Sequence, residues 1–241
     1  MSDGKYNAYE LVAGNPNASV FFSCEHASQE MPPGWEWDPR DERLIDTHWA
    51  YDLGAAELTH ELAARYDAGA ILARFSRLLI DPNREPESDT LFRNIADGES
   101  VYMNVGVTPD DARTRLERCY LPFHDAFRQQ VEVANAGVLF SVHSFTPSYE
   151  GHARAMEVGV LFDQDEALAH SVAAAFEAGG FRVALNEPYS GKGGLMYSVQ
   201  EQATIHGRRA VELEVRQDLA VLPEQRSRVV DCLVACENLF A

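Results

Sequence analysis

The sequence predicts a three-layer α/β/α domain in which helices cover both faces of a central mixed sheet. Short apolar runs of strand length alternate along the chain with longer segments whose apolar residues recur at helical spacing. No internal repeat, low-complexity tract or charged linker interrupts this alternation. With 241 residues, the chain has the length of one large α/β domain, so we expect residues 1–241 to form a single domain.

Two of the expected strands lead directly to a histidine. The apolar run 18–24 ends just before His26, and the run 138–142 ends just before His143. The run 77–81 also has strand character, and Pro82 closes it. The remaining expected strands are 70–74, 158–162, 182–185 and 210–215.

The segments between the strands carry helical spacing of apolar residues. Thr108 is placed to cap a helix that begins at Pro109, because its hydroxyl can accept a backbone N–H and proline suits a first helical turn. A loop containing Pro and Trp, residues 31–40, follows the first strand. The expected helices are 44–66, 109–135 (one helix or a pair), 165–177 and 223–239. Strands that alternate with helices in this way form a parallel or mixed sheet covered on both faces.

The charge balance limits the classes of partner. The chain has 20 Lys and Arg residues against 38 Asp and Glu residues, a formal net charge of −18 at pH 7. A surface of this charge repels phosphate groups, so neither nucleic acid nor an anionic membrane is an expected partner. An anionic small-molecule substrate would need a local cluster of arginines inside an otherwise acidic protein. Nothing in the sequence indicates the oligomeric state.

The termini and the cysteines predict a cytoplasmic protein. The first residues are polar and no apolar signal segment follows them. No stretch approaches the ~20 apolar residues that a membrane span requires. The four cysteines form no Cys-x-x-Cys pair, which is typical of buried thiols in a reducing compartment.

The two strand-end histidines are the first candidates for chemistry. A lone histidine after a strand is more often a capping or packing residue than a ligand. However, ligands bind beyond the carboxyl ends of the strands in such sheets, and His26 and His143 would both lie there. Because neutral imidazole is the commonest transition-metal ligand, we predict a metal-dependent hydrolase centred on His26 and His143.

The last expected strand supplies a candidate general base. Its alternation places Glu212 and Glu214 on one face and apolar residues on the other. On a surface strand these would be solvated side chains, but in a sheet covered on both faces a glutamate needs a partner or a function. A carboxylate beside a metal-activated water is the usual general base of a metal-dependent hydrolase.

Three arginines surround the Asp81–Asn83 turn. Arg74, Arg77 and Arg84 lie within eleven positions of one another and provide the cationic cluster that an anionic substrate would require. The planar guanidinium suits this task because it can bind a carboxylate through two hydrogen bonds. The alternative is that these arginines only neutralise neighbouring acids.

Five segments, in matching order, resemble the N-formylglutamate amidohydrolase family. They are Ser-Cys-Glu-His-Ala-Ser at 23–28, Phe-Ser-Arg-Leu-Leu-Ile-Asp-Pro-Asn-Arg at 75–84, Val-His-Ser-Phe-Thr-Pro at 142–147, Asn-Glu-Pro-Tyr-Ser-Gly at 186–191 and Glu-Leu-Glu-Val-Arg-Gln-Asp at 212–218. The resemblance runs from about residue 18 to residue 219. That family is in turn similar to zinc carboxypeptidases and aspartoacylases, so the resemblance implies a zinc-carboxypeptidase-like (phosphorylase/hydrolase-like) fold.

The resemblance also implies roles for particular residues. Asn83 and Arg84 match the family's substrate clamp, His143 a zinc ligand and Glu214 the catalytic glutamate. Arg77 would stabilise the developing oxyanion or bind a carboxylate, and Arg74 would add to substrate binding. The implied cofactor is one Zn²⁺ per chain.

The implied reaction is hydrolysis of a small anionic N-acyl amino acid, with N-formyl-L-glutamate giving formate and glutamate. Two other classes stay open at this point. One is an aspartoacylase- or carboxypeptidase-like hydrolase that acts on another acyl amino acid. The other is a non-catalytic small-molecule-binding protein on the same fold.

One departure from the related enzymes leaves the third metal ligand open. The carboxypeptidase-like motif is His-x-x-Glu, but Gln29 stands three residues after His26. We favour His48, because it lies near the start of the expected helix 44–66 and would face the crevice. The alternatives are Glu30, Asp46 and Asp52. In addition, His124 matches the family pattern, although a structural role is at least as good an explanation.

Overall fold

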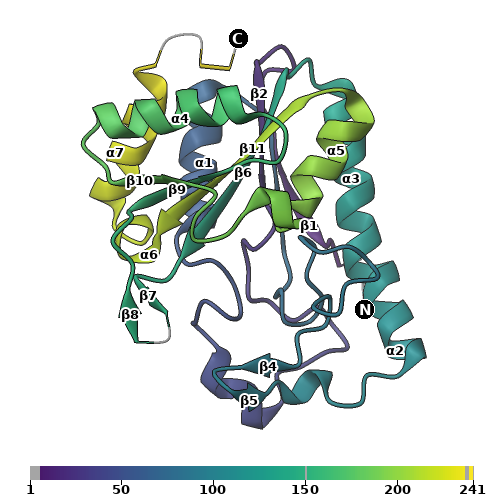
Figure 1. The fold of residues 1–241 in the computed structure, drawn as a ribbon. Coiled ribbons are helices and arrows are strands. Elements are labelled where there is room, and N and C mark those ends of the chain that lie inside the picture. The colour runs from purple at the N-terminus through teal and green to yellow at the C-terminus, as the bar shows by residue number, and fades with distance from the viewer. Residues whose placement is uncertain (1–5, 150, 237–238, 241) are drawn as a thin grey trace.

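The computed structural model describes residues 6–149, 151–236 and 239–240, and its centre is a seven-stranded mixed sheet (Figure 1). The strand order is β1-β3-β2-β6-β11-β9-β10. Strands β3, β2, β6 and β11 run parallel, β1 pairs antiparallel at one edge, and β9 runs antiparallel to β11 and parallel to β10. The strand bounds are β1 Tyr9–Val12, β2 Val20–Cys24, β3 Ala70–Ala73, β6 Val138–Phe145, β9 Val158–Leu161, β10 Val183–Leu185 and β11 Arg209–Arg216.

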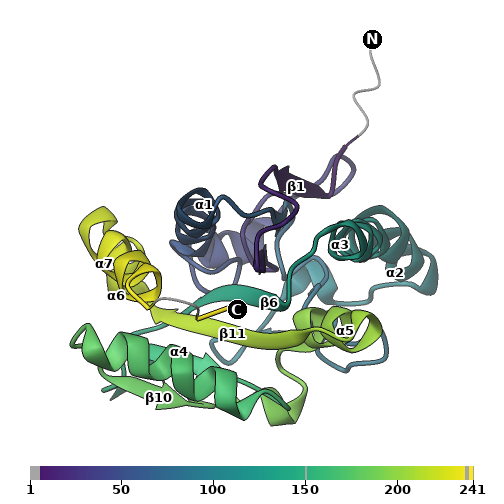
Figure 2. The same ribbon diagram turned by 90° about the horizontal axis from the view of Figure 1, so that it is seen from above.

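Helices cover both faces of this sheet, as the view from above shows (Figure 2). They are α1 Ala55–Tyr66, α2 Pro109–Arg115, α3 Leu121–Val133, α4 Glu166–Ala178, α5 Tyr197–His206, α6 Gln217–Ala220 and α7 Pro223–Val234. Short 3-10 helices occupy Pro39–Leu44, Tyr102–Asn104 and Gly191–Gly193, and a π-helical turn, Leu116–Tyr120, joins α2 to α3. Two small ribbons pair β4 Ile95–Ala96 with β5 Glu99–Ser100 and β7 Ser148–Tyr149 with β8 His152–Ala153.

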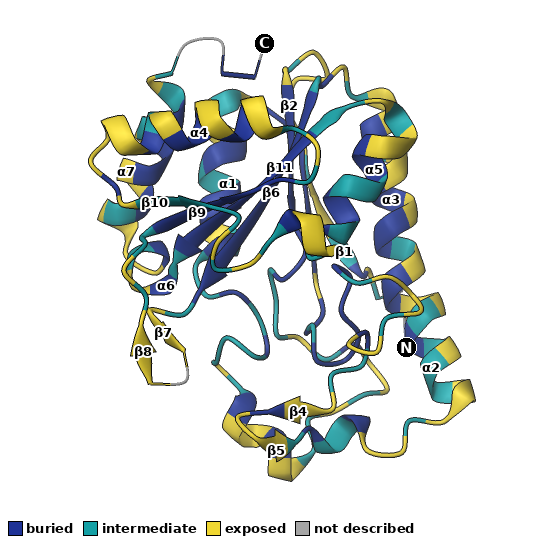
Figure 3. Ribbon diagram, viewed as in Figure 1, coloured by how far each residue is buried: buried dark blue, intermediate teal, exposed yellow. Residues whose placement is uncertain are grey.

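Successive side chains along each strand point to opposite faces of the sheet, so the hydrophobic core has two halves. On β2, Phe22 belongs to the hydrophobic cluster that includes residues of α1, α4 and α7, whereas its neighbour Phe21 belongs to the cluster that includes residues of α3 and α5. On β6, Phe140 and Leu139 divide in the same way. The inner strands β2, β3, β6, β9 and β11 are therefore buried on both faces, in agreement with their near-continuous apolar sequence, whereas the edge strands β1 and β10 are partly exposed (Figure 3). The predicted three-layer α/β/α architecture is confirmed.

One expected helix starts later than predicted, and one expected strand does not form. The helix expected from residue 44 begins only at Ala55, because Asp46 and Gly54 take positive φ angles of 60° and 81° that no α-helix contains. At Gly54 a Cβ atom would meet the backbone oxygen of Ala220 at 2.3 Å, so glycine is required there. The expected strand 77–81 is instead a series of buried turns, in which Ser76 Oγ accepts a hydrogen bond from the Leu78 N–H at 3.2 Å.

The bounds of other predicted elements differ less from those in the structure. The helical segment 109–135 is present as α2, the π-helical turn and α3. The closing helix ends at Val234, and residues 237–238 of the expected 223–239 lie outside the described residues. Strand β1 and helix α5 were not expected. In the described part of the chain, every helix is too short or too polar to cross a membrane.

Candidate active site

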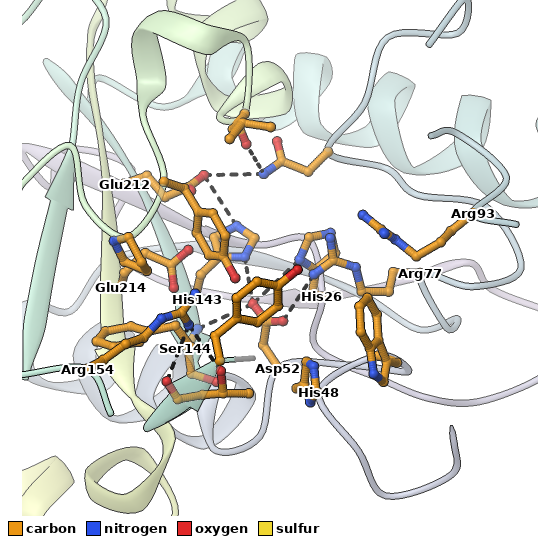
Figure 4. Close-up of a pocket in the computed structure, with 18 of the residues that line it drawn as sticks. His26, His48, Asp52, Arg77, Arg93, His143, Ser144, Arg154, Glu212 and Glu214 are labelled. Carbon is orange, nitrogen blue, oxygen red and sulfur yellow. Dashed lines mark hydrogen bonds and ion pairs between the residues drawn. The ribbon is translucent and has the colours of Figure 1, made fainter. Parts of the chain in front are cut away.

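Three buried side chains converge where β2, β6 and the start of α1 meet. His26 lies two residues beyond the end of β2, His143 lies within β6, and Asp52 precedes the turn at Gly54. One ligand atom from each residue lies within 4.8 Å of the other two. His143 Nδ1 lies 2.8 Å and His26 Nδ1 3.5 Å from the same Asp52 carboxylate oxygen, Oδ2 (Figure 4). This His26–Asp52–His143 cluster could hold a metal ion.

The far nitrogen of each imidazole faces a second carboxylate. His26 Nε2 lies 2.7 Å from Asp81 Oδ1, and His143 Nε2 lies 3.1 Å from Glu25 Oε2. Without a metal, His143 Nδ1 lies at hydrogen-bond distance from Asp52 and carries a proton there; a metal held between His26, His143 and Asp52 would take its place, and each histidine would then donate from Nε2 to the carboxylate behind it. His26 Nδ1 has no hydrogen-bond partner among the described residues. Metal-binding histidines typically have a carboxylate behind the ring in this way.

The backbone around Asp52 explains why this residue joins the cluster. Its N–H donates a 2.9 Å hydrogen bond to the carbonyl of His26, which anchors the turn beside the histidine. The Asp52 carboxylate also accepts a 3.3 Å hydrogen bond from the N–H of Ser144, next to His143 in β6. Burial would raise the pKa of Asp52, but His26 and His143 hold it well below its usual range.

The favoured third ligand, His48, is outside this cluster. Its side chain lines the same pocket, its ring lies 4.7 Å from that of Trp49, and burial lowers its pKa. Of the alternatives, Glu30 forms an ion pair with Arg74, and Asp46 accepts a hydrogen bond from Gln29. The expectation for His48 depended on the helix 44–66, which does not form at that position.

Glu212 and Glu214 both face the pocket from β11 and are 2% and 4% exposed. Glu212 is engaged, because its Oε2 accepts a 3.3 Å hydrogen bond from Asn83 and lies 3.4 Å from His143 Nε2. Glu214 Oε2 has no partner among the described residues. Burial raises the pKa of Glu214 well above its usual value, as do Asp52 and Glu212, while His143 lowers it.

The sequence-predicted arginines have different surroundings. Arg77 is largely buried and bridges Asp81 at 3.0 Å and Asp52 at 3.4 Å. Arg84 lines the pocket, where its guanidinium donates to Thr90 Oγ1 at 3.2 Å and to the Asn83 carbonyl at 2.7 Å. Arg74 is not brought to the pocket, and its side chain is 44% exposed beside Glu30.

Asn83 lies at the pocket, but its side chain is already fully occupied. Its Nδ2 donates to the carbonyl of Leu195 at 2.9 Å and to Glu212, and its Oδ1 accepts from the N–H of Ser198 at 3.0 Å. The structure therefore places Asn83 as a link that holds Glu212 to the segment before α5.

Sequence reasoning missed two arginines of the pocket. Arg93 lies 5.2 Å from the centre of the Trp49 ring, and Arg154 lies between 5.1 and 5.6 Å from three aromatic rings, those of Phe145, Tyr149 and Tyr189. In the view of Figure 4, Arg154 lies on one side of the histidine pair and Arg93 on the other. Neither could be found from spacing, because neither directly follows one of the strands that the sequence predicts.

The pocket as a whole is a cavity of about 430 Å³, and several of the arginines that line it are not paired with an acid in the described part of the chain. Among the residues that the structure describes, Arg84, Arg93 and Arg154 form no ion pair, although the chain has a large excess of acids. A cavity of this size accommodates a small molecule, and unpaired guanidinium groups favour an anionic one.

Comparison with known proteins identifies the family of this chain. The model of the N-formylglutamate amidohydrolase family matches residues 18–221. A gene product of Agrobacterium tumefaciens has a crystal structure with a TM-score of 0.87 and 27% sequence identity, covering 98% of this chain and 95% of that one. An N-formylglutamate amidohydrolase from Ralstonia eutropha has the same fold, with a TM-score of 0.73 and 18% identity over 95% of this chain and 97% of that one.

No curated protein matches the sequence. The family match covers most of the chain, including every residue of the His26–Asp52–His143 cluster and both glutamates of β11. The chain therefore belongs to the N-formylglutamate amidohydrolase family.

Proposed function

We propose that this protein is a zinc-dependent hydrolase that cleaves the amide bond of N-formyl-L-glutamate or a closely similar N-acyl amino acid. The observation that carries the proposal is the convergence of His26 Nδ1, His143 Nδ1 and Asp52 Oδ2, each histidine having a carboxylate behind it. The family match supports amide hydrolysis as the reaction class.

The donor set fits zinc. Two imidazoles and one carboxylate are a common ligand set of catalytic zinc sites, which keep a position open for water or substrate. Ligands of a tetrahedral zinc at 2.0–2.1 Å lie roughly 3.3 Å apart. The two measured separations from Asp52 Oδ2, 2.8 and 3.5 Å, lie on either side of that value. A zinc ion held here would lower the pKa of a water molecule to roughly 7 and polarise the scissile carbonyl.

Glu214 supplies the general base in this proposal. Its unpartnered Oε2 faces the pocket, and its raised pKa makes the carboxylate a stronger proton acceptor. Glu214 removes a proton from the attacking water as the water oxygen bonds to the acyl carbon. The same proton then goes to the amide nitrogen as the C–N bond breaks, releasing the free acid and the amino acid.

The arginines bind and orient the substrate. Arg77, fixed between Asp52 and Asp81, places a positive charge beside the carbonyl oxygen, where negative charge develops. Arg84 binds the α-carboxylate, as the family resemblance implies. Arg154 and Arg93 provide further unpaired guanidinium groups for a side-chain carboxylate.

Zinc analysis combined with a product assay tests the proposal. The purified protein should contain one zinc per chain and release formate from N-formyl-L-glutamate faster than from N-formyl-L-glutamine, while acetate release from N-acetyl-L-aspartate should be slower. Asp52→Ala should lose the zinc, whereas His48→Ala should retain it. A protein that binds zinc yet hydrolyses none of these amides would contradict the proposed reaction. Zinc loss in His48→Ala alone would instead change only the third ligand.

A further inference from the structure

One peptide unit connects the His26–Asp52–His143 cluster to Glu212 of β11. The N–H of Asn83 donates a 2.9 Å hydrogen bond to Asp81 Oδ1, the same oxygen that faces His26 Nε2. The Asn83 side chain in turn holds Glu212. The orientation of the Pro82–Asn83 peptide therefore influences both the carboxylate behind His26 and the carboxylate beside His143.

Tyr120, the last residue of the π-helical turn, and His124 of α3 hold this turn from behind. His124 Nε2 lies 3.0 Å from the carbonyl oxygen of Pro82, and the Tyr120 hydroxyl donates a 2.8 Å hydrogen bond to the carbonyl of Arg84. The two residues are four apart and therefore lie on the same helical face. They are only 5% and 3% exposed, so water does not compete for these carbonyls.

The local helix geometry explains why both side chains reach the turn. The N–H of Leu121 bonds to the carbonyl of Leu116, five residues back, which makes the π-helical turn. Pro122 follows it and has no N–H to offer the carbonyl four residues back. The wider turn ends at Tyr120, directly before the α-helical segment that carries His124.

The ring of His124 packs against that of Tyr120, with centroids 4.2 Å apart and planes inclined by 33°. Its Nδ1 lies 3.6 Å from Glu201 Oε2, too far for a hydrogen bond. Because the Pro82 carbonyl can only accept, Nε2 must carry the proton. Burial raises the pKa of the Tyr120 hydroxyl, which keeps it protonated as a donor to Arg84.

We infer that His124 and Tyr120 are positioning residues with separate targets. His124 fixes the Pro82–Asn83 peptide, and through it the Asp81 carboxylate behind His26 and the Asn83 contact to Glu212. Tyr120 fixes the backbone of Arg84, and through it the guanidinium that faces the substrate. The inference rests on the proposed function for its kinetic consequences, because His26 and Glu212 belong to the reacting side of the pocket and Arg84 to substrate binding.

Separate targets predict separate kinetic effects. His124→Phe keeps a ring but removes the donor to Pro82, so kcat for N-formyl-L-glutamate should fall roughly tenfold, the lower limit for loss of an orienting contact at a metal site, with KM little changed. Tyr120→Phe removes only the hydroxyl, so KM should rise about fivefold, as expected for one neutral hydrogen bond, with kcat little changed. His124→Gln restores an N–H near Nε2 and should recover part of kcat.

Tyr6→Phe is the matched control. Tyr6 also donates its hydroxyl to a backbone carbonyl, that of Arg74 at 2.6 Å, but Arg74 does not line the pocket. Its kcat and KM should both equal those of the parent. If His124→Phe and Tyr120→Phe behave like Tyr6→Phe, or if kcat falls only in proportion to the loss of folded protein, the inference is wrong.

An NMR measurement on the metal-free protein needs no substrate turnover, so it tests this inference separately from the proposed function. In the metal-free protein, the imidazole ¹⁵N signals of His26 should shift in His124→Phe and remain unchanged in Tyr120→Phe, because only His124 acts on the peptide that holds Asp81. Such a shift would support the positioning role even if the parent hydrolyses no N-acyl amino acid. Unchanged His26 signals in His124→Phe would overturn it even if the parent is an active amidohydrolase.

Discussion

At the scale of single residues, the site is a set of carboxylates with different roles assigned by their neighbours. Asp52 faces both imidazoles, Asp81 lies behind one of them, and Glu25 lies behind the other. Arg77 neutralises two of these acids, which lets them stay ionised although they are buried. Glu214 has no such partner and is the group left free for chemistry.

Replacing Glu214 tests this division directly. Glu214→Gln keeps the shape of the side chain, so zinc content and substrate affinity should be retained while kcat falls roughly 10²–10⁴-fold, the usual contribution of a positioned proton-transfer group. Glu212→Gln should reduce kcat much less, because Glu212 is already bound to Asn83. Steady-state kinetics on both variants, with zinc analysis, makes the comparison. Equal activities of Glu214→Gln and the parent would remove Glu214 from the mechanism.

At the scale of elements, the close approach of β9 to β11 determines the position of the Glu214 side chain. Gly159 of β9 is the register partner of Glu214 in this antiparallel pair. A Cβ atom at Gly159 would lie 2.2 Å from the backbone oxygen of Glu187 and 3.2 Å from Glu214 Cβ. Glycine at this position thus lets the 186–191 segment pass over β9 beside the site.

Gly159→Ala should therefore affect stability and activity together. Because backbone must move to admit the methyl group, we expect a loss of about 1–3 kcal/mol in the free energy of unfolding. The displacement of Glu214 should also lower kcat. Denaturant unfolding and kinetics measure both effects. Gly193→Ala is the control, since a Cβ there has no heavy atom within 4 Å, and a similar loss in that variant would refute the steric explanation.

At the scale of the whole molecule, the protein is strongly acidic on balance but concentrates arginines at one pocket. The net charge is −18, yet Arg77, Arg84, Arg93 and Arg154 line the same cavity. Burial and the neighbouring Arg77 both lower the pKa of Arg93, which indicates how closely these cations are gathered. An anionic substrate would relieve that repulsion on binding.

Glu25, the buried acid behind His143, also makes the stability of the metal-free protein depend on pH. Burial would raise the pKa of Glu25, but hydrogen bonds from His143 and Ser141 lower it to about 2 from 4.5. Between these two pH values the folded state therefore binds fewer protons than the unfolded state. The stabilisation that ionised Glu25 gives the folded protein is complete above pH 4.5 and is lost as the pH falls toward 2. A shift of this size corresponds to about 3 kcal/mol.

Urea unfolding with a chelator present, at several pH values from 7 to 3, checks this expectation. The parent should lose stability over the acid range, and Glu25→Gln, which cannot ionise, should show a weaker dependence on pH. Reduced repulsion among the other acids affects the parent and the variant alike, so the difference between them isolates Glu25. Parallel curves would show that Glu25 does not contribute.

The sequence by itself determined the layers, most of the sheet and the residue types of the site. Period-two and helical apolar patterns are local properties, which is why β2, β6, β11 and the helices α3, α4 and α7 could be predicted, together with His26, His143 and Glu214 at one edge of the sheet. The tertiary structure alone decided that Asp52 rather than His48 joins the histidines, because positive φ angles at Asp46 and Gly54 break the expected helix and the Asp52 N–H bonds to His26. It also decided that Asn83 holds Glu212, and that Arg154 and Arg93 reach the pocket while Arg74 does not. These outcomes depend on contacts between segments far apart in the chain, and such contacts leave no periodic signal in the sequence.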